Sequence, residues 1–440
     1  MILLLLLLLL LLGVSWLLNN KDIFAPSFVF CSSFLFSALW ATVYSKKWSL
    51  NLSYKTFLVI TFGVFIFIVI SYFVHIILYK RSRINVSKIP IRQNIETWKY
   101  ICFILFEVIV ICMVIKSLTS ITKVYGAKDL SNAIYLYRYH SLNGTLIKNL
   151  PGYLIWLRSC VSASGYWFAY IFSSKLIYEK KIPLLDSIVI ILAMINSSLL
   201  GGRNGVVNMI ISIFVCSYFI YLRSNGFKFK IKFLNIVKII LVFLLILILF
   251  QFTGELLGRN SIINSGVSLI DYLAKYCGAP IKNLDIFINS KDLGNISDNN
   301  QTFIYLVHLF GHFFGINTDY VLDLPFNKIN GFNLGNVYTT FYPFLYDYGY
   351  IGVVFLTGFM AAICQIIYEF ARRFNKNSLN VFLNVLYAYF FNSLVFSFFS
   401  NKFYEQNFSR GFFRILIFWL LFDLFFLRFS FKGRKISIKL

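Results

Sequence analysis

Charged side chains are scarce in this sequence, and acidic ones are the scarcest. Only 13% of the 440 residues are charged, with 17 Asp and Glu against 41 Lys and Arg, while 59% are hydrophobic. A soluble domain ordinarily has about 25% charged and roughly 45–50% apolar residues. Because side chains that face lipid need no charge, the composition excludes a soluble enzyme and indicates an integral membrane protein.

Motifs for metals and nucleotides are also missing. The seven cysteines stand singly without a C-x-x-C pair, so neither a disulfide framework nor a zinc site is indicated. No Walker lysine motif, dinucleotide glycine loop or Asp-x-Asp pair occurs, so we expect no metal, nucleotide or other cofactor. The net charge of +24 collects in loops between apolar runs, which favours membrane lipid over nucleic acid as a partner.

Long apolar runs occupy most of the chain. A membrane-spanning helix needs about 20 mostly apolar residues, and the sequence predicts an all-α, polytopic transmembrane helix bundle with about eleven spans in one integral membrane domain, 1–440. The first run lacks a basic n-region and a small-residue cleavage site, so we expect an uncleaved span instead of a signal peptide. The expected spans are Leu3–Leu18, Phe24–Tyr44, Phe57–Tyr79, Tyr100–Leu118, Tyr153–Ser174, Leu184–Leu200, Val206–Leu222, Leu234–Thr253, Tyr342–Phe370, Leu379–Ser400 and Phe412–Leu427.

The loops predict an orientation. Loops 80–99, 223–233 and 371–378 hold dense clusters of Lys and Arg, which mark the cytoplasmic side. The large loop 254–341, where acidic residues slightly outnumber basic ones, is therefore expected to face outward and to contain short helices, with the C-terminus inside. Lys46, Lys47 and Lys55 contradict this assignment locally.

Two outward segments are rich in aromatic residues. Segment 120–150 holds Tyr, Arg and His, and loop 254–341 adds Asn, Asp and Gly. Aromatic rings above polar surface suit sugar binding, although ordinary turns and an interfacial aromatic belt would look the same. The stretch Thr302–Ile316 predicts a helix that lies on or dips into the outer leaflet.

Charge inside or beside an apolar span is costly without a partner and often marks a functional site. Arg158 lies within a span, and Arg203 lies in the glycine-rich turn Gly201–Gly205 between two spans. Glycines let the backbone approach a ligand, and a guanidinium suits a phosphate or pyrophosphate. A tight hairpin whose arginine reaches lipid phosphates has the same composition, so both interpretations stay open. The other charges in or beside expected spans are Glu107, Lys116, Asp347 and Asp423.

Two pairs at i, i+4 spacing belong to the outward loop. Glu255 and Arg259 could present a base and a phosphate-binding cation on one helical face, or form an ordinary interfacial ion pair. His308 and His312 lack an H-E-x-x-H pattern and a third ligand, so we expect a base, a hydrogen-bonding group or a structural role instead of a metal site.

Two segments resemble one protein family. Leu199–Val207 is similar to the glycine-arginine turn of bacterial oligosaccharide repeat-unit polymerases, the O-antigen and capsule polymerase family. Asn336–Phe341 followed by Tyr346–Gly352 resembles the late signature of that family, and the resemblance extends loosely over the whole chain.

The resemblance implies an activity. These enzymes are glycosyltransferases at the outer face of the bacterial cytoplasmic membrane, and they join repeat units carried on undecaprenyl pyrophosphate. Arg203 matches by motif and would hold the donor pyrophosphate, together with Arg158 and Arg259. Glu255 or His308 would take the proton from the attacking hydroxyl, while Tyr338 and Asp347 could contact sugar or orient the loop. Asp347 could equally cap a helix.

Other functions remain open at this point. The related O-antigen ligase is not separated from a polymerase by sequence. A flippase for lipid-linked oligosaccharides would have shorter loops and internal repeats. A scaffold in the assembly complex would tolerate loss of the outer charges. A chain-length regulator and a flippase are the protein partners implied by the resemblance.

Overall fold

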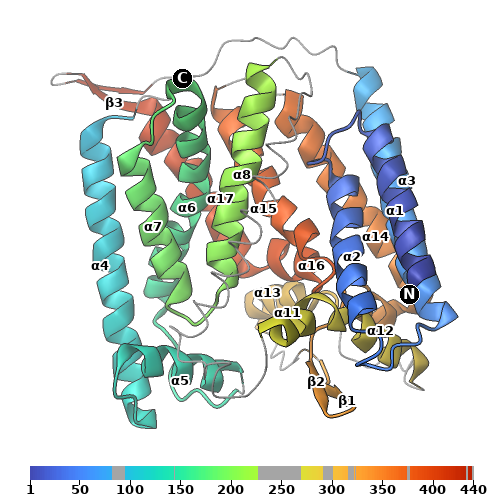
Figure 1. Cartoon of the computed structure of the whole chain (residues 1–440). Coiled ribbons are helices and arrows are strands. Elements are labelled where there is room, and N and C mark those ends of the chain that lie inside the picture. Colours follow the sequence, from blue (N-terminus) through green and yellow to red (C-terminus); the bar gives the residue numbers. More distant parts are fainter. Residues whose placement is uncertain are drawn as a thin grey trace. The chain divides into compact units, whose positions relative to one another are not determined.

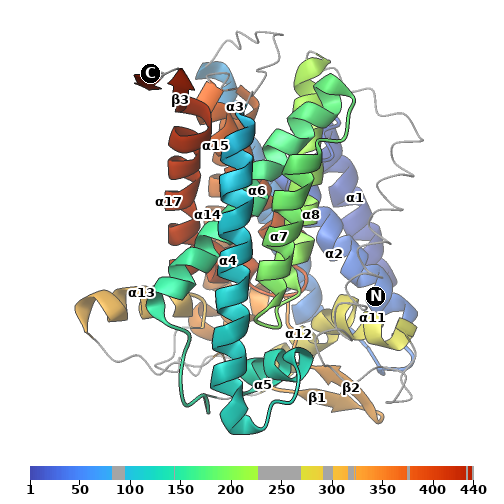
Figure 2. The same cartoon turned by 90° about the vertical axis from the view of Figure 1, so that its left-hand side faces the viewer.

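The computed structural model describes residues 1–81, 95–142, 144–225, 269–290, 301–315, 322, 324–373, 377–432 and 435–438. Regular structure in this part of the chain is helical apart from two short antiparallel hairpins, which confirms the all-α prediction (Figures 1 and 2). The chain divides into two compact units. Unit 1 comprises Met1–Asn85, Gly266–Arg373 and Phe390–Phe412, and unit 2 comprises Val86–Ser265, Phe374–Tyr389 and Phe413–Leu440.

Unit 1 is built on four apolar helices. These are α1 (Ile2–Leu18), α2 (Pro26–Val43), α3 (Tyr54–Arg81) and α14 (Phe341–Arg373). Pro26 begins α2 in the first turn, where its missing N–H costs nothing. Gly63 allows α3 and α14 to approach closely. A Cβ at this position would lie 2.4 Å from the ring of Phe341. The core of unit 1 is therefore an aromatic and aliphatic seam between these helices.

Shorter elements gather at the end of unit 1 where α3 begins (Figure 1). They are α11 (Leu269–Cys277), α12 (Ala279–Asn289), α13 (Ile304–Phe314), α16 (Lys402–Asn407) and the strands β1 (Asn327–Ile329) and β2 (Phe332–Gly335). Asp285 of α12 accepts hydrogen bonds from the Ser53 backbone N–H at 3.0 Å and the Thr56 hydroxyl at 2.8 Å. This carboxylate satisfies donors at the start of α3 and fixes α12 against it.

The basic loop between α2 and α3 belongs to this same end. Lys47 forms an ion pair with Asp271 of α11 at 3.0 Å, and Asn330 in the β1–β2 turn donates to the Ser49 hydroxyl at 2.9 Å. Lys46 and Lys47 thus share one end of unit 1 with the described parts of loop 254–341, although charge alone predicts opposite sides. The acidic partner of Lys47 lies about 220 positions away in sequence, so no local pattern reveals it.

Unit 2 holds the remaining long helices. They are α4 (Thr97–Thr122), α6 (Gly152–Glu179), α7 (Leu184–Ser198) and α8 (Asn204–Ser224), with the short 3₁₀ turn η1 (Lys123–Tyr125) and helix α5 (Leu130–Leu142) at one end. Gly165 allows α6 to approach its neighbours, because a Cβ there would lie 2.6 Å from Met209 Sδ and 2.9 Å from Ala193 Cβ. Helix α6 is accordingly the centre of this unit.

The C-terminal part of the chain completes both units. The chain passes from one unit to the other within α15 (Asn377–Val395) and again within α17 (Arg410–Phe422). Helix α17 continues as a π-helical segment, Asp423–Arg428, which is followed by β3 (Phe429–Lys432) and β4 (Lys435–Ile438). The ammonium of Lys99 on α4 donates to the carbonyls of Phe425 at 3.0 Å and Phe426 at 3.3 Å. A buried lysine thus supplies donors to carbonyls in the π-helical segment.

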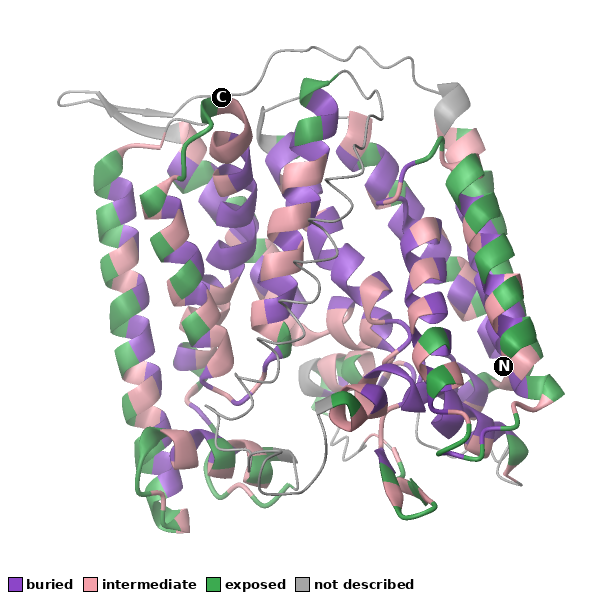
Figure 3. Ribbon diagram, in the orientation of Figure 1, coloured by how far each residue is buried: buried purple, intermediate pink, exposed green. Residues whose placement is uncertain are grey.

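The lengths and apolar character of the described helices can be compared with the expected membrane spans. Five are long and apolar enough to cross a membrane, namely Pro26–Val43, Tyr54–Leu78, Thr97–Tyr125, Asn204–Ser224 and Phe341–Arg373, and three shorter apolar ones are Ile2–Leu18, Leu184–Ser198 and Leu379–Val395. Exposed residues run along the sides of α3 and α4 (Figure 3), where Phe62, Phe65 and Leu105 are among the apolar ones. Such faces suit lipid. The expected span Leu234–Thr253 lies outside the described residues.

Candidate functional site

The glycine-arginine turn of unit 2 joins α7 to α8. Gly201 has a positive φ of 70°, and its N–H donates to the Ser198 carbonyl at 2.8 Å. Only glycine adopts this left-handed conformation without strain. Arg203 occupies the position just before α8 and is buried, with 5% of its surface exposed. The turn thus places a buried arginine at the start of α8, an end of the helix where backbone N–H groups and the helix dipole favour an anion.

Arg138 of α5 covers the two glycines. Its Nη1 donates to the Gly201 carbonyl at 2.8 Å. A Cβ on Gly201 would lie 2.8 Å from Arg138 Cδ, whereas one on Gly202 would lie 3.7 Å from Arg138 Nη1. A larger residue at position 201 is therefore disfavoured for two reasons: the positive φ, and the Arg138 side chain that lies against the Cα.

Arg158 of α6 is tied to the end of α7. Its Nη2 donates to the Asn196 carbonyl at 3.1 Å, and Asn196 Nδ2 donates back to the Arg158 carbonyl at 3.2 Å. The Nε–H of Arg158 has no acceptor among the described residues. None of the carboxylates that the structure describes forms an ion pair with it.

Two further residues lie within electrostatic range of Arg158. Tyr137 is buried on α5, and burial raises the pKa of its phenol, whereas the Leu150 backbone N–H and the Arg158 guanidinium oppose that rise. Arg414 of α17 is close enough to repel Arg158, and it lies 5.8 Å from the centre of the Trp156 ring. Two like charges near each other in a partly apolar setting favour an anion that offsets both.

We call this part of unit 2 the arginine end, defined by Arg138, Arg158, Arg203 and Arg414. Of the two arginines that the sequence singles out, Arg158 is hydrogen-bonded to Asn196 in the last turn of α7, and Arg203 lies in the glycine turn that follows this helix. Sequence reasoning missed Arg138 and Arg414 as candidates. A sequence signal for Arg138 was present, because this basic residue lies in the aromatic segment 120–150, within a run that has helical periodicity.

Two other candidates have structural contacts in unit 1. The Asp347 carboxylate accepts the backbone N–H groups of Gln301 at 2.9 Å and Thr302 at 2.6 Å. The Tyr338 hydroxyl donates to the Pro325 carbonyl at 2.9 Å and accepts from Asn327 Nδ2 at 3.0 Å. Asp347 therefore holds the segment that leads into α13, and Tyr338 holds the start of the β1–β2 hairpin.

The remaining candidates divide between described and undescribed parts. His308 lies on α13, within the expected surface helix Thr302–Ile316, and its carbonyl accepts a hydrogen bond from Arg410. Glu255 and Arg259 lie outside the described residues, as does the side chain of His312. No group of three or more His, Cys, Asp or Glu suited to a metal ion occurs in the residues that the structure describes.

The charges expected within other spans have local partners or are exposed. Glu107 is fully buried on α4 and accepts a hydrogen bond from the Ser164 hydroxyl at 2.6 Å. Lys116, on the same helix, is exposed. Asp423 forms an ion pair with Arg428 at 3.2 Å within the π-helical segment. The Glu107 contact joins α4 to α6, whereas the Asp423 ion pair stays within one segment.

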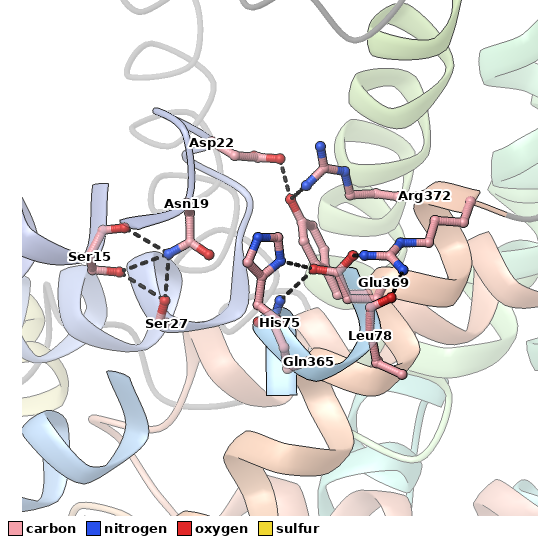
Figure 4. Close-up of polar contacts among 11 residues, drawn as sticks. Ser15, Asn19, Asp22, Ser27, His75, Leu78, Gln365, Glu369 and Arg372 are labelled. Atoms are coloured by element: carbon pink, nitrogen blue, oxygen red, sulfur yellow. Dashed lines mark hydrogen bonds and ion pairs between the residues drawn. The ribbon is translucent and has the colours of Figure 1, made fainter. Parts of the chain in front are cut away.

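A separate buried polar cluster lies in unit 1, between α3, α14 and the loop after α1 (Figure 4). Glu369 pairs with His75 at 2.5 Å and with Arg373 at 2.8 Å, and it accepts from Gln365 at 3.0 Å. Nearby, the Tyr368 hydroxyl donates to Asp22. The cluster joins three segments by charge inside an apolar unit.

Comparisons with protein-family models, with curated proteins and with solved structures find no match to this chain.

Proposed function

We propose that this protein is a polymerase that joins undecaprenyl-pyrophosphate-linked oligosaccharide repeat units into an O-antigen or capsule polysaccharide at the outer face of the bacterial cytoplasmic membrane. The proposal rests on the resemblance in the glycine-arginine turn and the late segment, and on one structural observation. Arg158 is a partly buried cation without a described carboxylate partner, and it is bonded to the helix that leads into the Arg203 turn.

A guanidinium in an apolar bundle that has no carboxylate partner among the described residues is costly, and a ligand of opposite charge removes that cost. A pyrophosphate offers several oxygens to the planar donors of arginine. Arg158 and Arg203 would offset the charge that develops on the leaving pyrophosphate, a kind of stabilisation for which loss of one donor typically costs about 10²–10³ in turnover.

The proposed reaction is a glycosyl transfer that needs no nucleotide or metal. The acceptor hydroxyl oxygen forms a bond to the anomeric carbon of the donor, and the bond from that carbon to the pyrophosphate oxygen breaks. The electron pair leaves with undecaprenyl pyrophosphate, and the hydroxyl proton passes to a base. Glu255 and His308 are the candidate bases, and Arg259 is a further candidate ligand of the pyrophosphate.

Polysaccharide analysis in cells separates this function from its rivals. In a strain that lacks the gene, a polymerase defect leaves a single repeat unit on the acceptor, a ligase defect leaves polymer on the carrier lipid, and a flippase defect gives neither. The deletion is then complemented with wild type, Arg203→Ala and, as a matched control, Lys128→Ala. Lys128 is an exposed basic residue in the same outward segment as α5.

We expect wild type and Lys128→Ala to restore the full ladder and Arg203→Ala to leave single repeat units at normal protein level. A full ladder from Arg203→Ala would remove the pyrophosphate role of this turn. Stranded polymer in the deletion strain would instead identify a ligase, and loss of both products would identify a flippase. An unchanged ladder in that strain would contradict all three enzymatic or transport functions, whereas a changed ladder that Arg203→Ala fully restores would favour a scaffold.

A further inference from the structure

Helix α5 is joined to the glycine-arginine turn through the side chain of Arg138. We propose that Arg138 is a positioning residue: it fixes the backbone of Gly201 and Gly202 and so sets the direction in which the Arg203 side chain leaves the turn. This inference rests on the proposed function, since it concerns the group that would hold the donor pyrophosphate.

The contact between Arg138 and the turn is extensive for a single side chain. The guanidinium Nη1 donates to the Gly201 carbonyl at 2.8 Å, while the methylenes of the same side chain lie against the Gly201 Cα, on the side where a Cβ would point. Nη1 also borders Gly202. One arginine thus holds the carbonyl of one glycine and covers both.

The two glycines of the turn would leave its backbone flexible without such a constraint. Two successive glycines have more backbone freedom than any other pair of residues, and the chain loses that freedom when the turn is ordered. Arg203 follows them directly and precedes α8. A hydrogen bond at the Gly201 carbonyl, two residues before Arg203, restricts the peptide planes that decide where the Arg203 guanidinium lies.

Helix α5, which carries Arg138, is itself well packed. Ala133, Ile134 and Tyr137 are all buried on it, so the helix is packed against unit 2 along the stretch that leads to Arg138. Because the Nη1 donor and the stem of Arg138 are both engaged by the turn, we assign its effect to the turn and not to contact with the substrate.

The test uses the full-length protein purified in nanodiscs, with lipid-linked oligosaccharide extracted from the strain that lacks this gene as the substrate. Arg138→Ala, Arg138→Gln, Arg138→Lys, Arg203→Ala and Lys128→Ala are compared by kcat, by KM for the lipid-linked substrate and by thermal unfolding. Displacement of a catalytic group by about 1 Å can cost up to about 100-fold in rate. We expect Arg138→Ala to lower kcat by about 10- to 100-fold and to change KM by less than about threefold.

The two conservative variants separate positioning from direct charge. Gln and Lys each keep a donor for the Gly201 carbonyl, so we expect both to recover at least part of the lost kcat. Recovery by Lys with no recovery by Gln would mean that the charge of residue 138 acts on the substrate and would overturn the positioning role. A large rise in KM for Arg138→Ala would overturn it in the same way.

Failure of this inference is distinguishable from failure of the proposed function. If Arg203→Ala is inactive while Arg138→Ala turns over like Lys128→Ala, the positioning role is wrong and the arginine site stands. If Arg203→Ala is fully active, both the pyrophosphate-binding role of the turn and the positioning role of Arg138 are wrong. If Arg138→Ala is unfolded, the Gln and Lys variants decide: wild-type kcat in both supports positioning through the donor, and wild-type KM with lost kcat in both contradicts it.

Discussion

The Arg138 guanidinium donates a 2.8 Å hydrogen bond to the Gly201 carbonyl, and its methylenes occupy the space that a side chain at residue 201 would need. The two residues are far apart in sequence and lie on α5 and on the turn after α7. This relationship makes the two adjacent glycines of the turn unequal, because only Gly201 has both a positive φ and a neighbour within 3 Å of its missing Cβ.

Gly201→Ala should therefore be harmful and Gly202→Ala should be tolerated. A left-handed φ costs an L-residue about 1–2 kcal/mol, and the alanine methyl would also displace Arg138. Residue 202 has an ordinary φ and its nearest neighbour at 3.7 Å, which is normal van der Waals distance. Protein level, thermal unfolding and the polysaccharide ladder of both variants provide the measurement. Equal behaviour of the two variants would contradict the geometry of this turn.

Asn196→Asp should separate stability from activity at the arginine end. Asn196 is fully buried and exchanges hydrogen bonds with the Arg158 backbone and side chain. An aspartate there would lose the Nδ2 donor to the Arg158 carbonyl but would add a negative charge near the Arg158 guanidinium, so we expect a loss of thermal stability no greater than that of Asn196→Ala. The carboxylate would also neutralise the charge proposed to bind pyrophosphate, so we expect polymerisation to fall by about tenfold or more.

Asn196→Ala is the matched control for that variant, because it removes the hydrogen bonds that Nδ2 donates to the Arg158 carbonyl and the Ser162 hydroxyl without adding charge. We expect it to lower stability by about 1–3 kcal/mol through the loss of buried hydrogen bonds. If Asn196→Asp retains full activity, the charge of Arg158 has no part in the reaction.

Asp347→Asn should weaken the fold. The carboxylate accepts two backbone N–H groups, from Gln301 and Thr302, and an amide would turn a donor toward one of them. Hydrogen bonds to charged groups contribute about 1.5–3 kcal/mol, so we expect a lower midpoint of thermal unfolding in detergent. A variant that unfolds like wild type but loses affinity for glycan would instead favour a sugar-binding role for Asp347.

Glu369→Ala should destabilise unit 1 strongly. Glu369 is buried and pairs with His75 and Arg373 (Figure 4). Removing one partner of a buried ion pair leaves uncompensated charge and typically costs about 3–5 kcal/mol. His75→Ala is the comparison, since Glu369 keeps Arg373 in that variant and the loss should be smaller. Thermal unfolding of both variants measures this order, and a reversed order would contradict it.

Cysteines introduced at Lys46 and Asn330 should react with a membrane-impermeant maleimide from the same side of the membrane. Both positions are exposed, and the loop of Lys46 is hydrogen-bonded to Asn330. We expect labelling from outside intact spheroplasts, with Lys181→Cys as the control for the inner side, in a background without native cysteines. Labelling of Lys46→Cys and Asn330→Cys from opposite sides would contradict the arrangement of unit 1.

Much of the fold follows from the sequence. The ends of α1, α2 and α8 lie within a few residues of the expected spans, because apolar runs bounded by polar turns leave a helix as the only way to satisfy backbone groups away from water. The break in α14 at Gly349, where φ is 60°, falls within the late segment that the sequence singles out.

The sequence by itself determined that this chain is helical and apolar and that a glycine-arginine turn separates two helices. Only the tertiary structure decided which side chains surround that turn. Arg138 of α5 contacts the turn, Arg158 of α6 contacts the last turn of α7 before it, and Lys47 pairs with Asp271 of a distant segment. Periodicity and composition report the local preference of each segment, whereas these contacts depend on how separate helices pack, which no single segment encodes.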